Sequence, residues 1–417
     1  MNCPLPNRLL QATSCLATPT ERRLHAADRA QPISRTMLAY RSLHGTASSD
    51  HLDLVRGLAA LAVMLGHLRK LFFVDSPEIR GHSNLLLEIM YFATGFGHEA
   101  VMIFFVLSGF LVGGSVLRGR MDGEWSWRPY ATNRLTRLWV VLIPALLLGA
   151  IWDRSGIFVF GTHGIYGGLV QNHVVQFVVR PRLSGTVMLG NALFLQGILT
   201  PTFGTNGPLW SLSFEFWYYV LFPLVVLAFP AWKVGWSAIL YATAATLIAF
   251  FIGESMSIYF LIWLLGAAIN LAPTSSGRLA TLWIGVATAA LLSLLAVLKF
   301  KPGFTEYPHD FVVAVASVAL IYALLRSSAR STSGFYSRAA HRLAGFSYTL
   351  YVVHLPALAF MSAWLAGRRW QPDSVHIVAG AALAICILAY AFVIAQFTEY
   401  RTSEVRARVT AVIGLNG

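Results

Sequence analysis

The feature that most constrains this chain is a series of long apolar runs that recur along nearly its whole length after residue 50. Each run has about 17–25 residues, which is enough for a helix to cross the roughly 30 Å hydrocarbon layer of a bilayer. Hydrophobic residues make up 56% of the chain and charged residues only 12%, a balance outside the range of soluble globular proteins. Inside hydrocarbon, backbone N–H and C=O groups must pair within the chain, which favours helices. The sequence therefore predicts an all-α polytopic membrane protein.

Ten of these runs are long enough to be transmembrane helices. We expect the helices at residues 53–73, 98–117, 134–152, 208–230, 234–252, 256–272, 280–298, 309–326, 344–366 and 376–398. Most loops on the side of the N-terminal tail, and the C-terminal tail itself, are rich in arginine. Because cytoplasmic loops carry an excess of Lys and Arg, we expect both termini to be cytoplasmic. Topology then accounts for the net charge of +13, and no nucleic-acid partner is expected.

All ten runs lie within residues 50–400, which we expect to form one transmembrane domain. Residues 1–49 are polar and basic, and we expect a disordered tail, although an organelle transit peptide or an over-extended start would have the same composition. Residues 401–417 are expected to form a cytoplasmic tail. Residues 153–207 contain two apolar stretches that are short or interrupted by polar residues, which indicates interfacial or re-entrant helices. If both stretches crossed the membrane, the number of helices would be twelve, with the termini unchanged.

The first apolar run carries three ionisable side chains, Asp53, Arg56 and His67. On a helix, Arg56 and His67 lie on one face, because eleven residues make three turns plus about 20°, and they are separated by roughly 16 Å along the axis. Asp53 is placed to pair with Arg56 one turn later. A charged group at the bilayer centre costs at least ~2.5 kcal/mol, so the stripe indicates a functional cavity. In the alternative interpretation, Asp53 and Arg56 mark the interface and His67 only bonds a neighbouring helix.

The run at residues 208–230 contains a carboxylate, Glu215, about 10 Å inside the outer surface. His67 is expected at a similar depth. A carboxylate at that level can orient an imidazole and stabilise its protonated form, which leaves the other ring nitrogen free to act as a general base. Alternatively, Glu215 is a packing residue that bonds Ser211, Ser213 or an indole.

Three arginines, Arg128, Arg134 and Arg137, lie at the cytoplasmic start of the third run. Arg134 and Arg137 are three residues apart and therefore share one face of a helix. Paired guanidinium groups near a helix N-terminus suit phosphate oxygens, so the cluster is a candidate site for a phosphate-bearing cofactor. The enrichment of arginine in cytoplasmic loops explains the cluster equally well.

Three further residues, His98, Asn206 and His354, are candidates for contact with a substrate. His354 lies in the middle of an apolar run, and His98 opens another run from the outside, where it lines an acceptor entrance or is simply solvated. Asn206 begins the stretch that leads to Glu215. Ser108 lacks a G-x-S-x-G context and is surrounded by small residues, so we interpret it as a helix-packing residue. The sequence has no HExxH, Walker, GxGxxG or CxxC pattern, so it predicts no metal and no permanently bound cofactor.

Four segments occur along the chain in the order LDLVRGLAALAVMLGHL, AVMIFFVLSGFLVGG, NGPLWSLSFEFWYYVLFPL and FSYTLYVVHLP. Together they resemble the membrane-bound acyltransferase-3 family, and the resemblance covers about residues 50–400. The first segment has the family's spacing of a basic residue, ten residues and a histidine, at Arg56 and His67. Two features depart from the pattern. Val101–Ile103 stand where relatives often carry an acid, and the last run ends without the Glu-x-Pro of many relatives.

The resemblance implies a multi-pass enzyme of a bacterial inner membrane. It would take an acyl group, most often acetyl in this family, from acyl-coenzyme A in the cytoplasm and pass it to a hydroxyl of a glycan or another cell-surface acceptor. The donor, this acceptor and the lipid bilayer would be its partners. His67 matches the family's essential histidine and Arg56 its basic partner.

By the same resemblance, Arg134 and Arg137 match a pair that meets the coenzyme, and Glu215 matches an acidic motif residue. His67 would act as a general base, which is worth about 10²–10⁴-fold in rate, or carry the acyl group itself. A proton-coupled transporter is the main alternative, with the stripe and Glu215 as its proton path. We find neither the inverted repeats nor the paired broken helices that would favour it. A non-catalytic scaffold fits poorly with so many buried ionisable groups.

Overall fold

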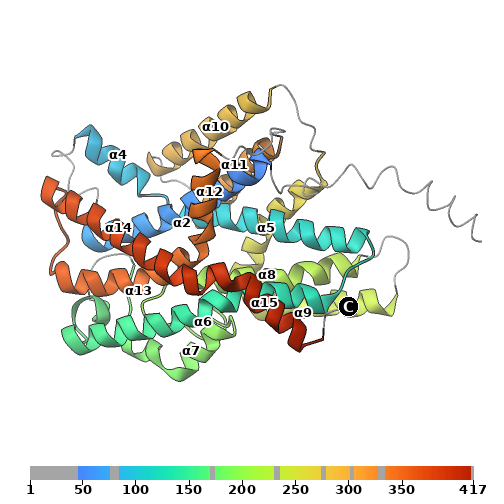
Figure 1. The fold of residues 1–417 in the computed structure, drawn as a ribbon, viewed down its shortest axis with the longest axis horizontal. Helices are drawn as coiled ribbons and strands as arrows, with labels where there is room; N and C mark the ends of the chain where they lie inside the picture. The colour runs from blue at the N-terminus through green and yellow to red at the C-terminus, as the bar shows by residue number, and fades with distance from the viewer. Residues whose placement is uncertain are drawn as a thin grey trace, which may run out of the picture.

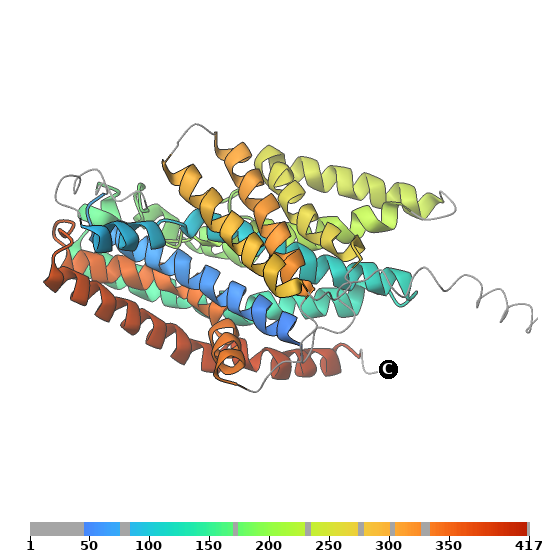
Figure 2. The same ribbon diagram turned by 90° about the horizontal axis from the view of Figure 1, so that it is seen from above.

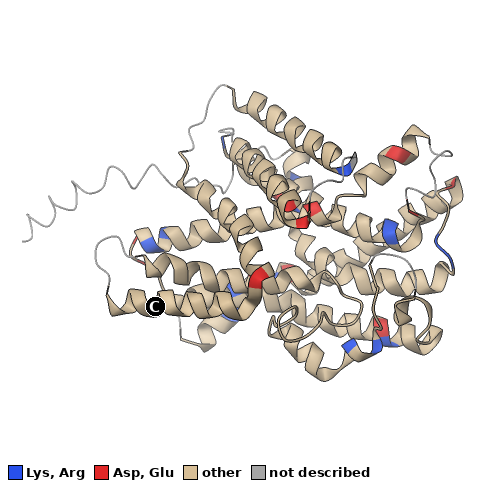
Figure 3. Cartoon of the chain, turned by 180° about the vertical axis from the view of Figure 1, so that it is seen from behind, with Lys and Arg blue, Asp and Glu red and all other residues tan. Residues whose placement is uncertain are grey.

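The structure is a computed structural model that describes residues 46–75, 84–169, 174–229, 235–273, 279–300, 305–326 and 334–414. The disordered tail expected at residues 1–49 lies almost entirely outside these residues. In the described part of the chain, long helices run side by side along the longest axis of the molecule, and no strands pair into a sheet (Figure 1). Charged side chains are sparse along these helices (Figure 3).

Nine helices within the described ranges are long and apolar enough to cross a membrane. They are α2 (Ala47–Phe72), α5 (Gly97–Met121), α6 (Trp127–Phe160), α8 (Leu209–Ala228), α9 (Trp236–Ala268), α10 (Ala280–Phe300), α11 (Glu306–Leu325), α13 (Ser347–Leu365) and α14 (Ser374–Phe397). The all-α polytopic membrane fold is therefore confirmed.

The tenth predicted helix is found inside α9, which is divided at Gly253. The backbone of Gly253 has φ +81° and ψ 177°, a conformation that interrupts a helix and that glycine adopts without a steric penalty. The Ser257 hydroxyl donates a hydrogen bond to the Ala249 carbonyl at 3.1 Å. In an uninterrupted helix these residues would lie about 12 Å apart. The chain therefore folds back at Gly253, between segments that correspond to the predicted helices 234–252 and 256–272.

Several shorter helices were not predicted. They are α4 (Leu85–Ala93) before α5, α12 (Phe335–Gly345) before α13, and α15 (Thr402–Val412) after α14. α15 packs along α6, so most of the expected C-terminal tail is helical. Between residues 153 and 207, the described residues contain the end of α6, two short 3₁₀ helices and α7 (Gly185–Ala192). No membrane-length helix begins there, which agrees with the expected non-crossing segments and leaves the twelve-helix alternative unsupported.

α2 occupies a central position in the bundle. It lies between α10 and α11 on one face of the molecule and α13 and α14 on the other (Figure 2). Its direct neighbours include α5, α12 and α13. The polar stripe of α2 therefore faces other helices, as the cost of exposing charge to hydrocarbon requires.

α5 and α9 approach each other closely because glycines line their contact. A Cβ atom added to Gly109 would lie 2.0 Å from the carbonyl oxygen of Trp263, and one added to Gly266 would lie 2.0 Å from the carbonyl oxygen of Val106. Such close contacts between small residues hold membrane helices together. The small residues of the second quoted segment thus pack α5 against α9 and fix the position of Ser108 between them.

Candidate active site

The predicted pair between Asp53 and Arg56 is present at the N-terminal end of α2. A carboxylate oxygen of Asp53 lies 3.4 Å from the Arg56 guanidinium. Arg56 also donates a hydrogen bond to the carbonyl of Ala344, at the end of α12, at 3.1 Å. The other Asp53 oxygen lies 2.7 Å from His341 of α12. These contacts hold the guanidinium in place and tie α12 to α2.

Arg56 lines a cavity between α2, α5, α6, α8 and α13 that we call the arginine cavity. Its polar lining comes from Arg56, Ser108, Arg134, Arg137, Ser211, Glu215, Tyr219, Ser347, Tyr348 and Tyr351. Arg134 donates a hydrogen bond to the Ser115 hydroxyl at 3.0 Å and lies over the Tyr219 ring. The structure thus brings the predicted Arg134 and Arg137 pair together with Arg56, although Arg56 is on another helix.

Arg128 lies elsewhere. It borders a groove between α6 and α15, with Val405 and Val409 of α15 among the lining residues. Arg128 is six residues before Arg134, so on a helix the two side chains point about 120° apart, and Arg128 faces away from the arginine cavity. The grouping of Arg128 with Arg134 and Arg137, which the sequence suggested, is therefore not found.

Glu215 belongs to the arginine cavity rather than to His67. Its carboxylate accepts hydrogen bonds from the Ser108 hydroxyl at 3.2 Å and from the Tyr219 hydroxyl one turn later. Trp263 in turn donates to the Ser108 hydroxyl at 3.2 Å. The expectation that Glu215 orients His67 is therefore wrong. Two residues at one depth need not meet, because each side chain also has a direction around its helix axis, which the depth argument left out.

His67 pairs with His354 instead. The two rings are stacked with centroids 5.1 Å apart, and His67 Nδ1 lies 2.8 Å from His354 Nε2. On its other side, His354 Nδ1 lies 2.8 Å from the carbonyl oxygen of Leu350, one turn earlier on α13. His354 has 0% of its surface exposed and does not line either of the two cavities. It lies behind His67, so its position does not support the predicted contact with a substrate.

This chain of contacts assigns the proton positions when both rings are neutral. A carbonyl oxygen can only accept, so His354 Nδ1 carries the hydrogen and His354 Nε2 keeps its lone pair. That lone pair accepts from His67 Nδ1–H. The remaining nitrogen, His67 Nε2, is then unprotonated and available as a base. A backbone carbonyl thus fixes the tautomer of His67 through a second histidine.

His67 lines a second cavity, which we call the histidine cavity. Lys70, Thr94, His98 and Trp210 supply most of its other polar groups. His98 also stacks on Trp210, with centroids 6.5 Å apart. The predicted substrate candidate His98 therefore faces the same space as His67. Asn206 does not line this cavity; its amide donates to the Val352 carbonyl at 2.8 Å and holds the loop before α8 against α13.

The two cavities adjoin at Val101 and Tyr351, which line both of them. The hydroxyls of Tyr351 and Ser211 share a hydrogen bond of 2.7 Å, which fixes the ring in its position. Val101 stands where relatives often carry an acid, so the wall between the cavities is apolar on the α5 side. A molecule that spans both cavities must pass these two side chains.

Sequence reasoning missed Glu399, the acid at the end of the last apolar run. Its carboxylate accepts hydrogen bonds from the backbone N–H and the hydroxyl of Thr349, each at 2.9 Å. It also interacts electrostatically with Arg56 and Arg137. The signal was present, since a lone carboxylate beside an apolar run is costly without a partner. Tyr219, one turn after Glu215, carried no comparable signal.

Comparison with known proteins relates the chain to acyltransferases. The acyltransferase domain of the acyltransferase-3 family matches residues 50–395. The chain is 27% identical over 374 residues to the acyltransferase MdmB of Streptomyces mycarofaciens, covering 80% of this chain and 87% of that protein. It is 23% identical over 205 residues to nodulation protein 10 of Rhizobium leguminosarum bv. viciae, covering 48% of this chain and 50% of that protein. No solved structure matches.

Proposed function

Because the chain belongs to the acyltransferase-3 family, we propose that it transfers an acyl group from acyl-coenzyme A in the arginine cavity to a hydroxyl in the histidine cavity. It is an integral membrane enzyme of the acyltransferase class, with an acyl donor and a hydroxyl acceptor. Acetyl is the first acyl group to test. The acceptor class we propose is a glycan or another cell-surface molecule, modified at a bacterial inner membrane.

One observation carries the proposal: a cavity lined by three arginines adjoins a cavity lined by His67. Guanidinium groups bind phosphate oxygens by charge-assisted hydrogen bonds, so Arg134 and Arg137 suit the phosphates of the donor. Both arginines lie on α6, near the end that we expect to be cytoplasmic. The acyl end of the donor would then extend past Val101 and Tyr351 towards His67.

In the proposed reaction, His67 Nε2 accepts the proton of the acceptor hydroxyl as the hydroxyl oxygen attacks the thioester carbonyl carbon. The new carbon–oxygen bond forms, the carbon–sulfur bond breaks, and the leaving sulfur receives the proton back from the imidazolium. A base of this kind is worth about 10²–10⁴-fold in rate. An acyl-imidazole route would use the same nitrogen as a nucleophile, and a covalently labelled His67 would identify it.

Thiol release from acetyl-coenzyme A by purified protein tests this proposal, with and without a crude glycan fraction from the host. We expect wild type to release thiol and His67→Ala to lose this activity. His376→Ala is a matched control, because His376 is a half-buried histidine that lines neither cavity and pairs with Asp373 at the start of α14. Equal rates for wild type and His67→Ala would overturn the role of His67, and no release from several acyl donors would overturn the donor class.

A further inference from the structure

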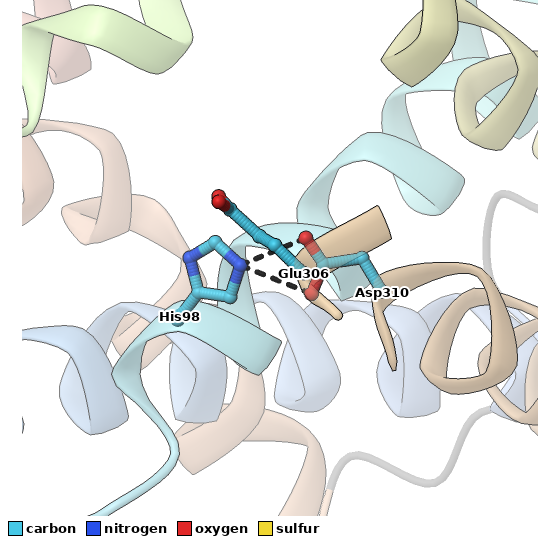
Figure 4. A group of neighbouring side chains, drawn as sticks. All are labelled: His98, Glu306 and Asp310. Carbon is cyan, nitrogen blue, oxygen red and sulfur yellow. Dashed lines mark hydrogen bonds and ion pairs between the residues drawn. The ribbon is translucent and has the colours of Figure 1, made fainter. Parts of the chain in front are cut away.

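A cluster of potential metal ligands lies where α5 and α11 begin. Its members are His98 on α5 and Glu306 and Asp310 on α11 (Figure 4). Taking one ligand atom from each residue, all three atoms lie within 4.8 Å of one another. His98 and Asp310 are 212 residues apart in the chain, so no local motif reveals the group. This explains why motif analysis predicted no metal.

The distances between His98 and Asp310 are close to those between two ligand atoms of one metal ion. His98 Nε2 lies 3.0 Å from Asp310 Oδ1 and 2.9 Å from Asp310 Oδ2. With metal–ligand bonds of about 2.0–2.2 Å, neighbouring ligand atoms are separated by roughly 2.8–3.1 Å in octahedral coordination and roughly 3.3–3.6 Å in tetrahedral coordination. Glu306 is four residues before Asp310 and shares its face of α11. Small side-chain rotations would bring all three ligands onto one ion.

The charges of the cluster call for a cation. The Asp310 side chain has 0% exposure, whereas Glu306, one turn earlier on α11, is exposed. Within the described ranges, the ion pairs of Asp310 are with His98 and His309, and no lysine or arginine pairs with Asp310 or Glu306. A third carboxylate, Glu99, lies 3.7 Å from His309. A fully buried carboxylate such as Asp310, with other carboxylates nearby, is costly unless a proton on a histidine or a metal ion compensates its charge.

The surroundings also resemble the outer shell of a metal site. The Tyr259 hydroxyl donates to Asp310 at 2.5 Å and lies 3.3 Å from Glu306. His309 Nδ1 lies 3.1 Å from the other Asp310 oxygen. Hydrogen bonds of this kind orient metal-binding carboxylates. They would remain in place if an ion replaced the hydrogen that His98 shares with Asp310.

We propose that His98, Glu306 and Asp310 bind one divalent transition-metal ion, such as Zn²⁺ or Mn²⁺. One imidazole nitrogen with two carboxylates suits these ions better than Mg²⁺ or Ca²⁺, which prefer oxygen ligands alone. Three protein ligands leave positions for water or a substrate hydroxyl. Because His98 lines the histidine cavity, the ion would sit at the wall of that cavity.

Metal binding tests the proposal without any assay of catalysis. The full chain, purified without a histidine tag, is stripped with a chelator, equilibrated with Zn²⁺ or Mn²⁺ and desalted before elemental analysis. We expect about one ion per wild-type chain, with affinity that falls at low pH because protons compete for the ligands. Co²⁺ should add visible absorption bands in the wild type.

The Glu306→Gln/Asp310→Asn double variant should lose the ion and the Co²⁺ bands, and His98→Asn, a change at a half-exposed residue, should weaken binding at least tenfold. The control is His376→Ala/Asp373→Asn, which removes another histidine–carboxylate pair and should retain the ion. Gel-filtration profiles confirm folding. Wild type without an ion, or the double variant with the same stoichiometry, would overturn the proposal and leave a proton on His98 as the compensating charge.

Discussion

The arginine cavity and the histidine cavity differ in how their polar groups are held. In the arginine cavity, three guanidinium groups face one carboxylate lining residue, Glu215, with the Glu399 carboxylate nearby. In the histidine cavity, His67 is held from behind by a neutral residue, His354, and a backbone carbonyl. Excess positive charge suits an anionic ligand, whereas a neutral imidazole with a fixed tautomer suits proton transfer. Under the proposed function, donor binding and proton transfer would therefore occur in separate places.

This comparison makes separable predictions for the two cavities, and replacement of His67 should have the largest effect. His67→Ala should lower kcat for acyl transfer by about 10²–10⁴-fold, because the base is removed. The dissociation constant of acyl-coenzyme A should stay within a factor of about two, since the phosphate contacts proposed to hold the donor lie in the arginine cavity. Stopped-flow transfer assays and calorimetric binding measure the two quantities. A parallel loss of donor affinity would contradict the division of roles.

Removal of the α6 arginines should have the opposite signature. A hydrogen bond to a charged group is worth about 1.5–3 kcal/mol, so each arginine should contribute about tenfold to a hundredfold in donor affinity. Arg134→Ala/Arg137→Ala should therefore raise the KM for acyl-coenzyme A much more than it lowers kcat. Arg128→Ala is the control, because Arg128 faces another groove. If Arg128→Ala raised KM as strongly as the double variant, general surface charge would explain the effect.

His354 contacts His67 and lines neither cavity, so its replacement should have an intermediate effect on the rate. His354→Leu removes the acceptor for His67 Nδ1–H and should lower kcat about 10–100-fold, as is typical when a partner that orients a histidine is lost. His354→Gln keeps a side-chain oxygen that can accept this hydrogen and should recover part of the rate. The pH–rate profile should shift in the leucine variant. Equal rates in the two variants would show that His354 only fills space.

Replacement of Tyr351 should have the smallest effect on the transfer rate and the most specific effect on the choice of acyl donor. Tyr351→Phe removes the hydrogen bond to Ser211, which is worth about 1 kcal/mol, and should change transfer only a few-fold. Tyr351→Ala removes the ring between the cavities and should increase the use of longer acyl donors relative to acetyl. Competition between acetyl- and octanoyl-coenzyme A measures this preference. An unchanged preference would mean that the acyl group reaches His67 by another path.

Much of the fold could be predicted, because each long helix leaves an apolar run in the sequence. The break at Gly253 was also predicted, since two separate transmembrane helices were expected within the residues of α9. The short helices α4 and α12 were not predicted. Each has too few residues to cross a bilayer, so a search for membrane-length runs passes over them.

The site could be predicted only in part, for a geometric reason. Residues on one helix share a known angular relation, so Asp53 and Arg56 were paired correctly. Residues on different helices meet only after rotation and packing are specified, and a sequence does not give these. His67 was therefore assigned to Glu215 instead of His354, and the contact between His98 and Asp310 was not foreseen. Glu399 shows the same limit, because its partners come from three other helices.

Arg56 and His67 belong to the same uninterrupted helix, and this restricts which genetic changes the protein can tolerate. Inserting or deleting one residue between them would rotate His67 by about 100° relative to Arg56 and move it along the axis by about 1.5 Å. His67 would then turn away from His354, or Arg56 away from its cavity. Substitutions among the intervening apolar residues leave this relation intact. We therefore expect the number of residues between Arg56 and His67 to be more strictly maintained than the identities of those residues.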